Sequence, residues 1–198
     1  GRGPLIKSAA ATIGIDRLAA QLGAKAVEVA PGWPSLSEAA VREHGALVID
    51  GVGGYAIGEH LPDRDGLAAG LLLVDYCLHK QRSLSELADE LEPFIDGGVY
   101  LCQVTRLAQP DPNAVTELLQ RLAPPLTVSG ITFNAGRAFG GERDPSGAPI
   151  ARKLLTEDGS WLLLQLDGGG CQLRLTVEAT SAERAEALMD VGKTIGTG

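Results

Sequence analysis

Apolar and polar positions alternate along the first half of the chain in blocks that predict strands and helices in turn. Short apolar runs at residues 4–10, 25–30 and 46–50 predict strands, and the last of them is continuous, as in strands that are buried on both faces of a sheet. Between these runs, apolar residues recur at helical spacing over residues 14–23 and 35–45. Ser35 and Glu38 have the spacing of a capping box at the start of the second helix.

Two more helices follow before the pattern changes. Residues 65–80 are too apolar for a surface helix, so we expect this helix to lie against the sheet. Residues 83–94 predict a helix in which Ser83 and Glu86 form a second capping box. The order β-α-β-α-β-α-α predicts a three-layer α/β/α domain over residues 1–97.

The second half has the pattern of an α+β domain. Residues 98–109 predict a strand, 110–125 a helix, 150–180 three strands joined by two Asp-Gly turns, and 181–193 a helix capped by Ser181. We therefore expect a smaller domain of antiparallel strands packed by helices over residues 98–198. A stretch rich in Gly, Ser and Pro at about 126–149 is read as an insert, and we leave open whether it is a lid, an interface or a flexible loop.

Charge and cysteine content narrow the classes of partner. The 198 residues carry a net charge of −8, which disfavours nucleic acid and anionic membrane as partners, because both need a basic surface. A phosphorylated ligand is still allowed, since a few local cations and a helix N-terminus can bind it. The three cysteines are far apart and have no metal-ligand spacing, so we expect reduced thiols in a cytoplasmic protein and no metal site.

Two stretches resemble a known family. Residues 53–91, which contain His-Leu-Pro-Asp-Arg-Asp-Gly at 60–66, and residues 157–189, which contain Asp-Gly-Ser-Trp and Leu-Arg-Leu-Thr-Val-Glu-Ala, are similar in order and spacing to parts of the α-D-phosphohexomutases. That superfamily contains the phosphoglucomutases and phosphomannomutases. The first stretch resembles its third domain after the sugar loop, and the second resembles its phosphate-binding fourth domain. The chain thus resembles the C-terminal half of a phosphohexomutase, and its opening at Gly1 without a Met is typical of a piece of a longer protein.

The resemblance implies how the chemistry is divided among four domains. In the family, the first domain supplies a phosphoserine in a Ser-His-Asn-Pro type loop, and the second supplies an Asp-Gly-Asp-Gly-Asp loop for Mg²⁺. This chain contains neither motif. We therefore expect no catalysis and no cofactor in the chain alone, with Mg²⁺ entering only through upstream domains, which are its expected partners. Homo-oligomerisation stays open.

The family's sugar loop, Gly-Glu-x-Ser-Gly-Gly/His, falls on a segment with altered chemistry. Asp50 stands at the position of the sugar-binding Glu, and Val52 stands at the position of the Ser and cannot hydrogen-bond through its side chain. Either Asp50 still accepts from a sugar hydroxyl or Asp50 and Gly51 only form a turn. The candidate sugar-loop residues are Asp50, Gly51, Val52, Gly53, Gly54 and Tyr55.

Neighbouring segments carry the rest of the candidate sugar site. Gly32 and Trp33 match a Gly-Phe/Trp-Lys motif of the family, but Pro34 replaces the lysine and removes a cation. Trp33 is read as a packed loop aromatic rather than a platform for a sugar. His60 is a candidate acid or base by residue type and a structural residue by its place in a turn, and Arg64 is expected to pair with a carboxylate.

The family's phosphate loop, Arg-Pro-Ser-Gly-Thr-Glu-Pro, falls on residues 165–171. Gln165 replaces the arginine, and Asp167 brings a negative charge to the phosphate position. Gly168, Gly169 and Gly170 either offer backbone N–H groups to an anion or form a tight hairpin turn.

Two functions follow from the resemblance. In the first, the chain is the C-terminal part of a divergent phosphoglucomutase/phosphomannomutase-like protein, whose intact form would interconvert hexose phosphates. In the second, it is a non-catalytic binding, regulatory or assembly module derived from such an enzyme. A sugar phosphate is a partner only if the altered loops still bind one.

Overall fold

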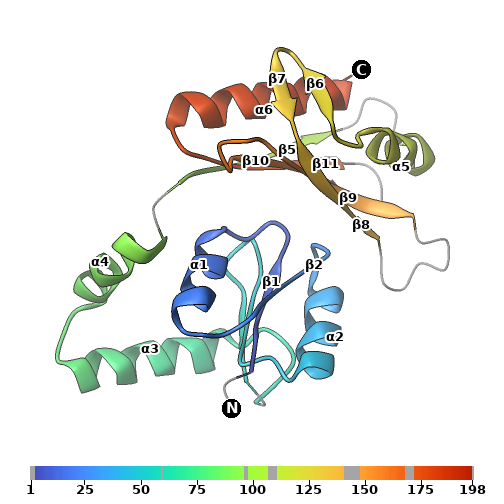
Figure 1. Cartoon of the computed structure of the whole chain (residues 1–198). Coiled ribbons are helices and arrows are strands. Elements are labelled where there is room, and N and C mark those ends of the chain that lie inside the picture. Colours follow the sequence, from blue (N-terminus) through green and yellow to red (C-terminus); the bar gives the residue numbers. More distant parts are fainter. Residues whose placement is uncertain are drawn as a thin grey trace. The chain divides into compact units, whose positions relative to one another are not determined.

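The computed structural model describes residues 3–58, 60–95, 98–106, 111–140, 148–167 and 172–197. The chain divides into two compact units, residues 1–97 and 98–198 (Figure 1). Each unit has its own sheet and its own buried core.

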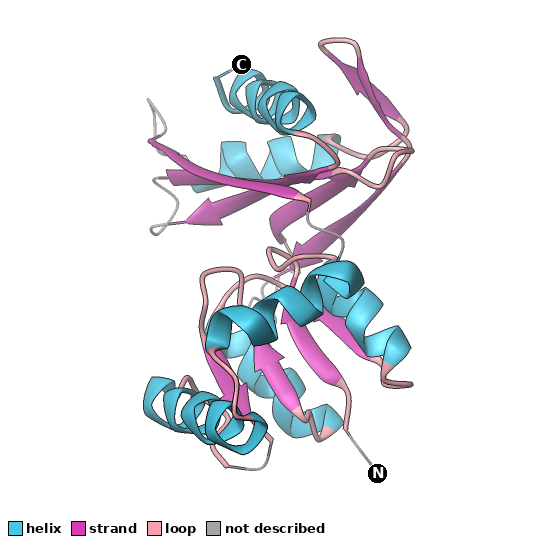
Figure 2. Cartoon of the chain, turned by 90° about the vertical axis from the view of Figure 1, so that its left-hand side faces the viewer, coloured by secondary structure: helices cyan, strands magenta, loops and turns pink. Residues whose placement is uncertain are grey.

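The first unit is built on a four-stranded sheet between helices (Figure 2). The strands are β1 (Leu5–Ser8), β2 (Ala26–Val29), β3 (Leu47–Ile49) and β4 (Tyr55–Ile57), in the order β2-β1-β3-β4. β1 pairs in parallel with β2 and β3, and β4 pairs antiparallel with β3. Successive residues of β1 point to opposite faces, so Leu5 packs with helix α1 (Gly14–Gln21) and Ile6 packs with helix α2 (Trp33–Glu43). The three-layer α/β/α prediction is confirmed.

Helix α2 starts earlier than its sequence predicts. It begins at Trp33, with Gly32 as N-cap at φ 114° and Pro34 in the first turn. Pro34 is the reason, because its fixed φ suits the first helical turn and moves the start ahead of Ser35. Ser35 then lies inside the helix, the N-cap makes no side-chain hydrogen bond, and the capping box of Ser35 and Glu38 is wrong.

Helix α3 (Gly66–Lys80) departs most from expectation. It makes contacts with β4 and with helix α4 (Leu84–Ile95), but none of its residues is buried. The prediction that this apolar helix lies against the sheet holds at strand β4, but the contact leaves every residue of the helix at least partly exposed. The two faces of the sheet are occupied by α1 and α2, which leaves α3 at the side of the unit.

Helix α4 begins with the predicted capping box. The Ser83 hydroxyl accepts the N–H of Glu86 at 3.3 Å, and the Ser83 N–H donates to Glu86 Oε2 at 2.8 Å. Leu87 is the buried residue of this helix, in the part of it whose side chains the structure describes, and α4 packs on α1.

The second unit is built on a five-stranded antiparallel sheet with the order β5-β11-β10-β9-β8. Its strands are β5 (Val99–Arg106), β8 (Ala135–Gly140), β9 (Pro149–Leu155), β10 (Trp161–Asp167) and β11 (Gln172–Ala179). Helices α5 (Pro112–Arg121) and α6 (Ala182–Thr197) cover one face, where Leu119 and Leu188 pack on Leu162, Leu164 and Leu175. The prediction of an α+β domain of antiparallel strands packed by helices is confirmed.

The stretch read as an insert contributes to the framework. Residues 126–140 form a hairpin of β6 (Leu126–Val128) and β7 (Ile131–Phe133) and then edge strand β8, and Phe133 is part of the core. Residues 141–147 lie outside the described part. Across the described residues, none of the helices has the length and apolar character needed to cross a membrane.

Candidate functional site

The candidate sugar loop is the turn of the β3–β4 hairpin, at the carboxyl end of β3. The Asp50 N–H donates to the Gly54 carbonyl at 3.0 Å, and Gly53 adopts φ +86°, which suits glycine. The loop packs tightly on the segment after β1, since a Cβ on Gly51 would lie 2.6 Å from Ala10 Cβ. Parallel β1 and β3 end at the same edge of the sheet, where open α/β sheets bind ligands.

The Asp50 carboxylate is engaged within its own loop. Its Oδ1 accepts the N–H groups of Val52 at 2.8 Å and Gly54 at 2.7 Å. Its Oδ2 forms an ion pair with Arg64 Nη2 at 2.9 Å, and Asp50 is only 7% exposed. The ion pair lacks hydrogen-bond geometry, so Oδ2 keeps accepting capacity, but its burial within the loop keeps it away from a sugar hydroxyl.

Arg64 also covers Trp33. Its guanidinium carbon lies 5.0 Å from the centroid of the Trp33 ring, so the cation stacks on the indole. Trp33 Nε1 is buried without a hydrogen-bond partner in the described part of the chain. The structure thus brings together Trp33, Asp50 and Arg64, which the sequence placed in three separate candidate segments. Pro34 is in the first turn of α2.

The close packing of the Asp50–Arg64 ion pair depends on Gly54. A Cβ at that position would lie 2.6 Å from Asp50 Oδ2 and 2.9 Å from Arg64 Nε, so no side chain fits there without displacing one of them. Val52, in contrast, is 69% exposed and offers solvent an apolar side chain at the position of the family's serine. Tyr55 begins β4 and is exposed.

His60 and Asp65 organise the start of helix α3. Asp65 is the N-cap, and its Oδ1 accepts the Ala68 N–H at 2.9 Å while its Oδ2 lies 3.0 Å from His60 Nε2. The hydrogen bond from the Ala68 N–H and that from His60 lower the pKa of Asp65 below its ordinary value, against a small opposing effect of burial. Both side chains are at the surface, and the contacts around His60 are those of a helix cap.

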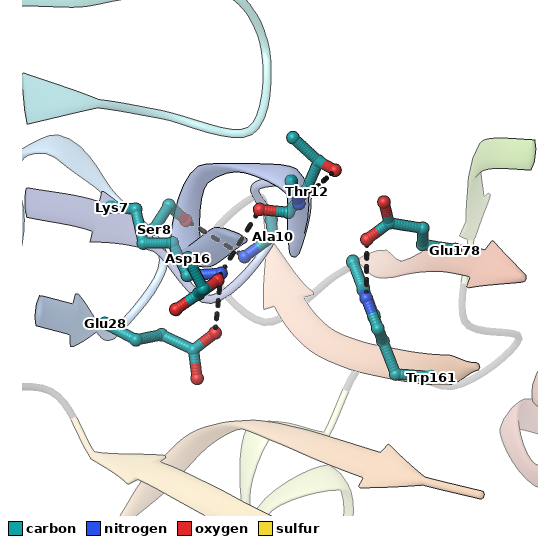
Figure 3. A network of polar contacts seen from close by, with 9 residues as sticks. Lys7, Ser8, Ala10, Thr12, Asp16, Glu28, Trp161 and Glu178 are labelled. Atoms are coloured by element: carbon teal, nitrogen blue, oxygen red, sulfur yellow. Dashed lines mark hydrogen bonds and ion pairs between the residues drawn. The ribbon is translucent and has the colours of Figure 1, made fainter. Parts of the chain in front are cut away.

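Sequence reasoning missed a buried cation at the edge that carries the sugar loop. The Lys7 side chain is 2% exposed and forms ion pairs with Asp16 and, at 3.5 Å, with Glu28; its Nζ also donates to the Thr12 carbonyl at 3.2 Å (Figure 3). These contacts join the end of β1 to α1 and β2. The only sequence signal is a lysine inside an apolar strand, and its two carboxylates give it a structural role.

In the second unit, Gln165 lies on β10 opposite Arg174 of β11 and Ala151 of β9. The backbone of Asp167 ends β10, whereas Gly168, Gly169 and Gly170 lie outside the described residues. The phosphate-loop prediction is therefore described only at its first positions, where glutamine stands in place of the family's arginine.

The same sheet carries a buried aromatic and charged cluster. Trp161 is fully buried, and its Nε1 donates to Glu178 Oε2 at 2.7 Å (Figure 3), while Lys153 Nζ lies 4.2 Å from the ring centroid. Tyr100 packs edge-on against Trp161 with the ring centroids 6.3 Å apart. Burial, with smaller effects of the neighbouring Cys102 and Glu178, raises the pKa of Tyr100 to about 12. These contacts hold β5, β11, β10 and β9 in register and make the cluster a structural one.

The comparisons with known proteins agree with the fold. Residues 1–94 match the family model of the phosphoglucomutase/phosphomannomutase alpha/beta/alpha domain III. No curated protein matches the chain significantly.

Solved structures match almost the whole chain. A protein described as a phosphomannomutase from Thermus thermophilus has 23% identity and a TM-score of 0.66 over 98% of this chain and 36% of its own. Parafusin, a phosphoglucomutase from Paramecium, has 16% identity and a TM-score of 0.72 over 98% and 37%. The N-acetylphosphoglucosamine mutase of Aspergillus fumigatus, in complex with glucose 1,6-bisphosphate, has 14% identity and a TM-score of 0.61 over 98% and 39%.

Residues 1–94 thus match the alpha/beta/alpha domain III of the phosphoglucomutase/phosphomannomutase family, and the whole chain has the fold of the corresponding part of the solved structures. The chain spans 36–39% of the length of these structures.

Proposed function

We propose that this chain is the C-terminal part of a divergent phosphohexomutase-like polypeptide, and that its sugar loop no longer reads a hexose phosphate. The observation that carries the proposal is the engagement of Asp50 by the Val52 and Gly54 N–H groups and by Arg64. The chain alone is then without mutase activity, and the Mg²⁺ of such chemistry would be held only by domains outside it.

The other ligand positions support the same conclusion. Val52 has no polar group for a sugar hydroxyl, Pro34 has no charge for a phosphate, and Gln165 replaces a bidentate arginine. Positions that shape the fold are kept, such as the capping Asp65 and the glycines of the loop. A site under selection for ligand binding would keep the polar groups first, because they supply the specificity.

Thermal shift with glucose 1-phosphate and glucose 1,6-bisphosphate tests the proposal. The bisphosphate is the ligand of the Aspergillus fumigatus mutase named above. We expect no rise in Tm at millimolar concentrations, since stabilisation requires binding to the native state. The matched variant is Asp50→Asn, compared with its own ligand-free Tm. A rise in the wild-type chain that Asp50→Asn abolishes would show a working sugar loop and overturn the proposal.

A second candidate is that the intact polypeptide is an active mutase, favoured by a fold likeness that extends over 98% of the chain. Activity then requires a phosphoserine loop and a three-aspartate Mg²⁺ loop in the preceding domains. The assay is interconversion of hexose 1- and 6-phosphates by the whole polypeptide. Without that activity, the chain is a binding, regulatory or assembly module. In both cases we propose the cytoplasm as its location and its own preceding domains as its partner.

A further inference from the structure

Helix α3 presents an apolar surface to solvent over most of its circumference. Leu67 is 83% exposed, Leu71 is 70% exposed and Leu78 is 73% exposed. Val74 lies on the same stripe, and Leu72, Leu73 and Tyr76 are exposed on the other sides of the helix. From Gly66 to Leu78 the only charged residue is Asp75. A helix that is apolar all round is normally buried, and a patch of this extent marks an interaction site.

The helix is capped at both ends and has few buried contacts along its sides. Asp65 caps its first turn, and Gln81 ends it in a left-handed conformation at φ 53°, where its N–H and that of Arg82 close onto the last carbonyls. Along its length only Ala68, Ala69 and Cys77 are half-buried. Helix α4 extends the apolar surface through exposed Leu84 and Leu91.

We propose that this α3 surface is the docking face for the domains that precede the chain in a phosphohexomutase-like polypeptide. The proposal rests on the proposed function above. The occupant is argued from chain length. The solved structures match 98% of this chain, but the match covers only 36–39% of their own length. A polypeptide of their length therefore has most of its residues outside the part that corresponds to this chain.

The chemistry of the surface fits a permanent contact between domains. Interfaces that stay closed are more apolar than transient ones, whose non-polar fraction is close to that of the rest of the protein surface. The α3 surface has seven large apolar side chains and one carboxylate between Gly66 and Leu78, so it fits another apolar protein surface. An anionic lipid surface does not fit, because such surfaces attract lysine and arginine.

The test measures the effect of Leu71→Lys on Tm in two proteins. One is the 198-residue chain, and the other is the whole polypeptide that is encoded by its reading frame. In the 198-residue chain the new lysine stays in water, so we expect an unchanged Tm. In the whole polypeptide it would be buried at the domain contact, and we expect Tm to fall by at least about 4 °C, because a buried unpaired charge is strongly destabilising. The matched control is Val41→Lys, at an apolar side chain of α2 that is 63% exposed; it should leave Tm unchanged in both backgrounds.

Three results would overturn the docking proposal. One is an equal effect of Leu71→Lys in both backgrounds. Another is a reading frame that encodes no preceding domains. The third is a dimer of the 198-residue chain in sedimentation that Leu71→Lys dissociates, which would assign the surface to a second copy. None of these readouts involves a sugar phosphate, so ligand stabilisation of the chain would refute the proposed function and leave the docking result intact.

Discussion

At the scale of single residues, the polar atoms of the loop after β3 make their contacts within the same unit. Its aspartate accepts two N–H groups of the loop and pairs with Arg64, which in turn stacks on Trp33. Each of these contacts uses a group that ligand recognition would need. The motif therefore keeps its backbone path while its polar atoms stabilise the turn, and the stability of the loop becomes the property to measure.

Gly54→Ala tests this close packing. The new Cβ would lie 2.6 Å from Asp50 Oδ2 and 2.9 Å from Arg64 Nε, so the ion pair must open. We expect the free energy of unfolding to fall by about 1 kcal/mol, at the low end for overpacked sites, because the exposed end of Arg64 can move aside. Urea unfolding measures it. The matched control is Gly66→Ala at the start of α3, where nothing lies within 4 Å and the change should be close to neutral. Equal effects of the two substitutions would refute the packing argument.

Asp158 gives a prediction for pH. Burial raises its pKa, but hydrogen bonds from Thr156 Oγ1 and the Ser160 N–H together with Arg184 outweigh burial and lower it to about 2. Because the folded pKa is below the ordinary 3.8, its contribution to stability is present above about pH 4 and is lost as the pH falls towards 2.

The acid dependence of Asp158→Asn should accordingly be flatter than that of the wild type between about pH 4 and pH 2. Urea unfolding at several pH values measures the difference. The size will be modest, since Asp158 is partly exposed and solvent screens its pair with Arg184. Asp190→Asn is the control, because its pair with Lys193 is on the surface of α6. Parallel pH curves for Asp158→Asn and the wild type would contradict the prediction.

At the scale of elements, helix starts depend on what stands next to the capping residue. Two Ser-x-x-Glu boxes are present in the sequence, but only Ser83 and Glu86 form the reciprocal hydrogen bonds. At Ser35 the preceding Pro34 starts the helix earlier, so the serine becomes an interior residue. A capping motif thus predicts a helix reliably and its first residue less so.

Ser83→Ala should destabilise the first unit by about 1 kcal/mol, the usual cost of losing an N-cap hydroxyl. Ser35→Ala is the matched variant, and we expect at most a small change because Ser35 caps nothing and alanine is the better helix former. Chemical denaturation followed by far-UV circular dichroism measures both. A loss at Ser35 as large as that at Ser83 would mean that the sequence-based capping box forms in solution.

The sequence predicts the elements that have a strong local pattern and misses strands that depend on pairing with another strand. The apolar runs of β1 and β3 and the stripe of α1 are strong local signals, and the structure has them. β4 was missed because Tyr55–Ile57 follow two glycines and have the pattern of a loop, while pairing with β3 makes them a strand. β6, β7 and β8 were missed for a similar reason, since their partners are distant in sequence or joined by a Ser-Gly turn. Pairing is a tertiary property, and composition alone cannot supply it.

The candidate site was predictable in position and less so in function. The sequence located Asp50, Trp33 and Arg64 in separate segments and left Asp50 with two roles. Only the structure shows that these residues meet, and the contacts of Asp50 with Arg64 support the structural role proposed above. Lys7 was missed because its partners, Asp16 and Glu28, are distant in sequence and meet it only through the parallel pairing of β1 with β2.

At the scale of the whole molecule, the two units have cores of different size. In the described residues, the core of the second unit joins 16 buried residues in one cluster around Leu162, Leu164 and Leu175. Among the described residues of the first unit, clusters of 7 and 4 buried residues lie on opposite faces of the sheet, and the most apolar helix is outside both. Stability scales with the apolar area buried, so the first unit should be the weaker one in this chain.

The two tryptophans allow the order in which the units unfold to be measured, since Trp33 is in the first unit and Trp161 in the second. In Trp33→Phe, the remaining emission comes from Trp161, which is fully buried and hydrogen-bonded to Glu178. Far-UV circular dichroism of the same sample reports both units. We expect ellipticity to be lost first, with the red shift of Trp161 emission following at higher urea. Coincident curves would mean that the units unfold together.

If the preceding domains cover α3, the early transition should move to higher urea in the whole polypeptide, because burial of the leucines then adds to the stability of the first unit.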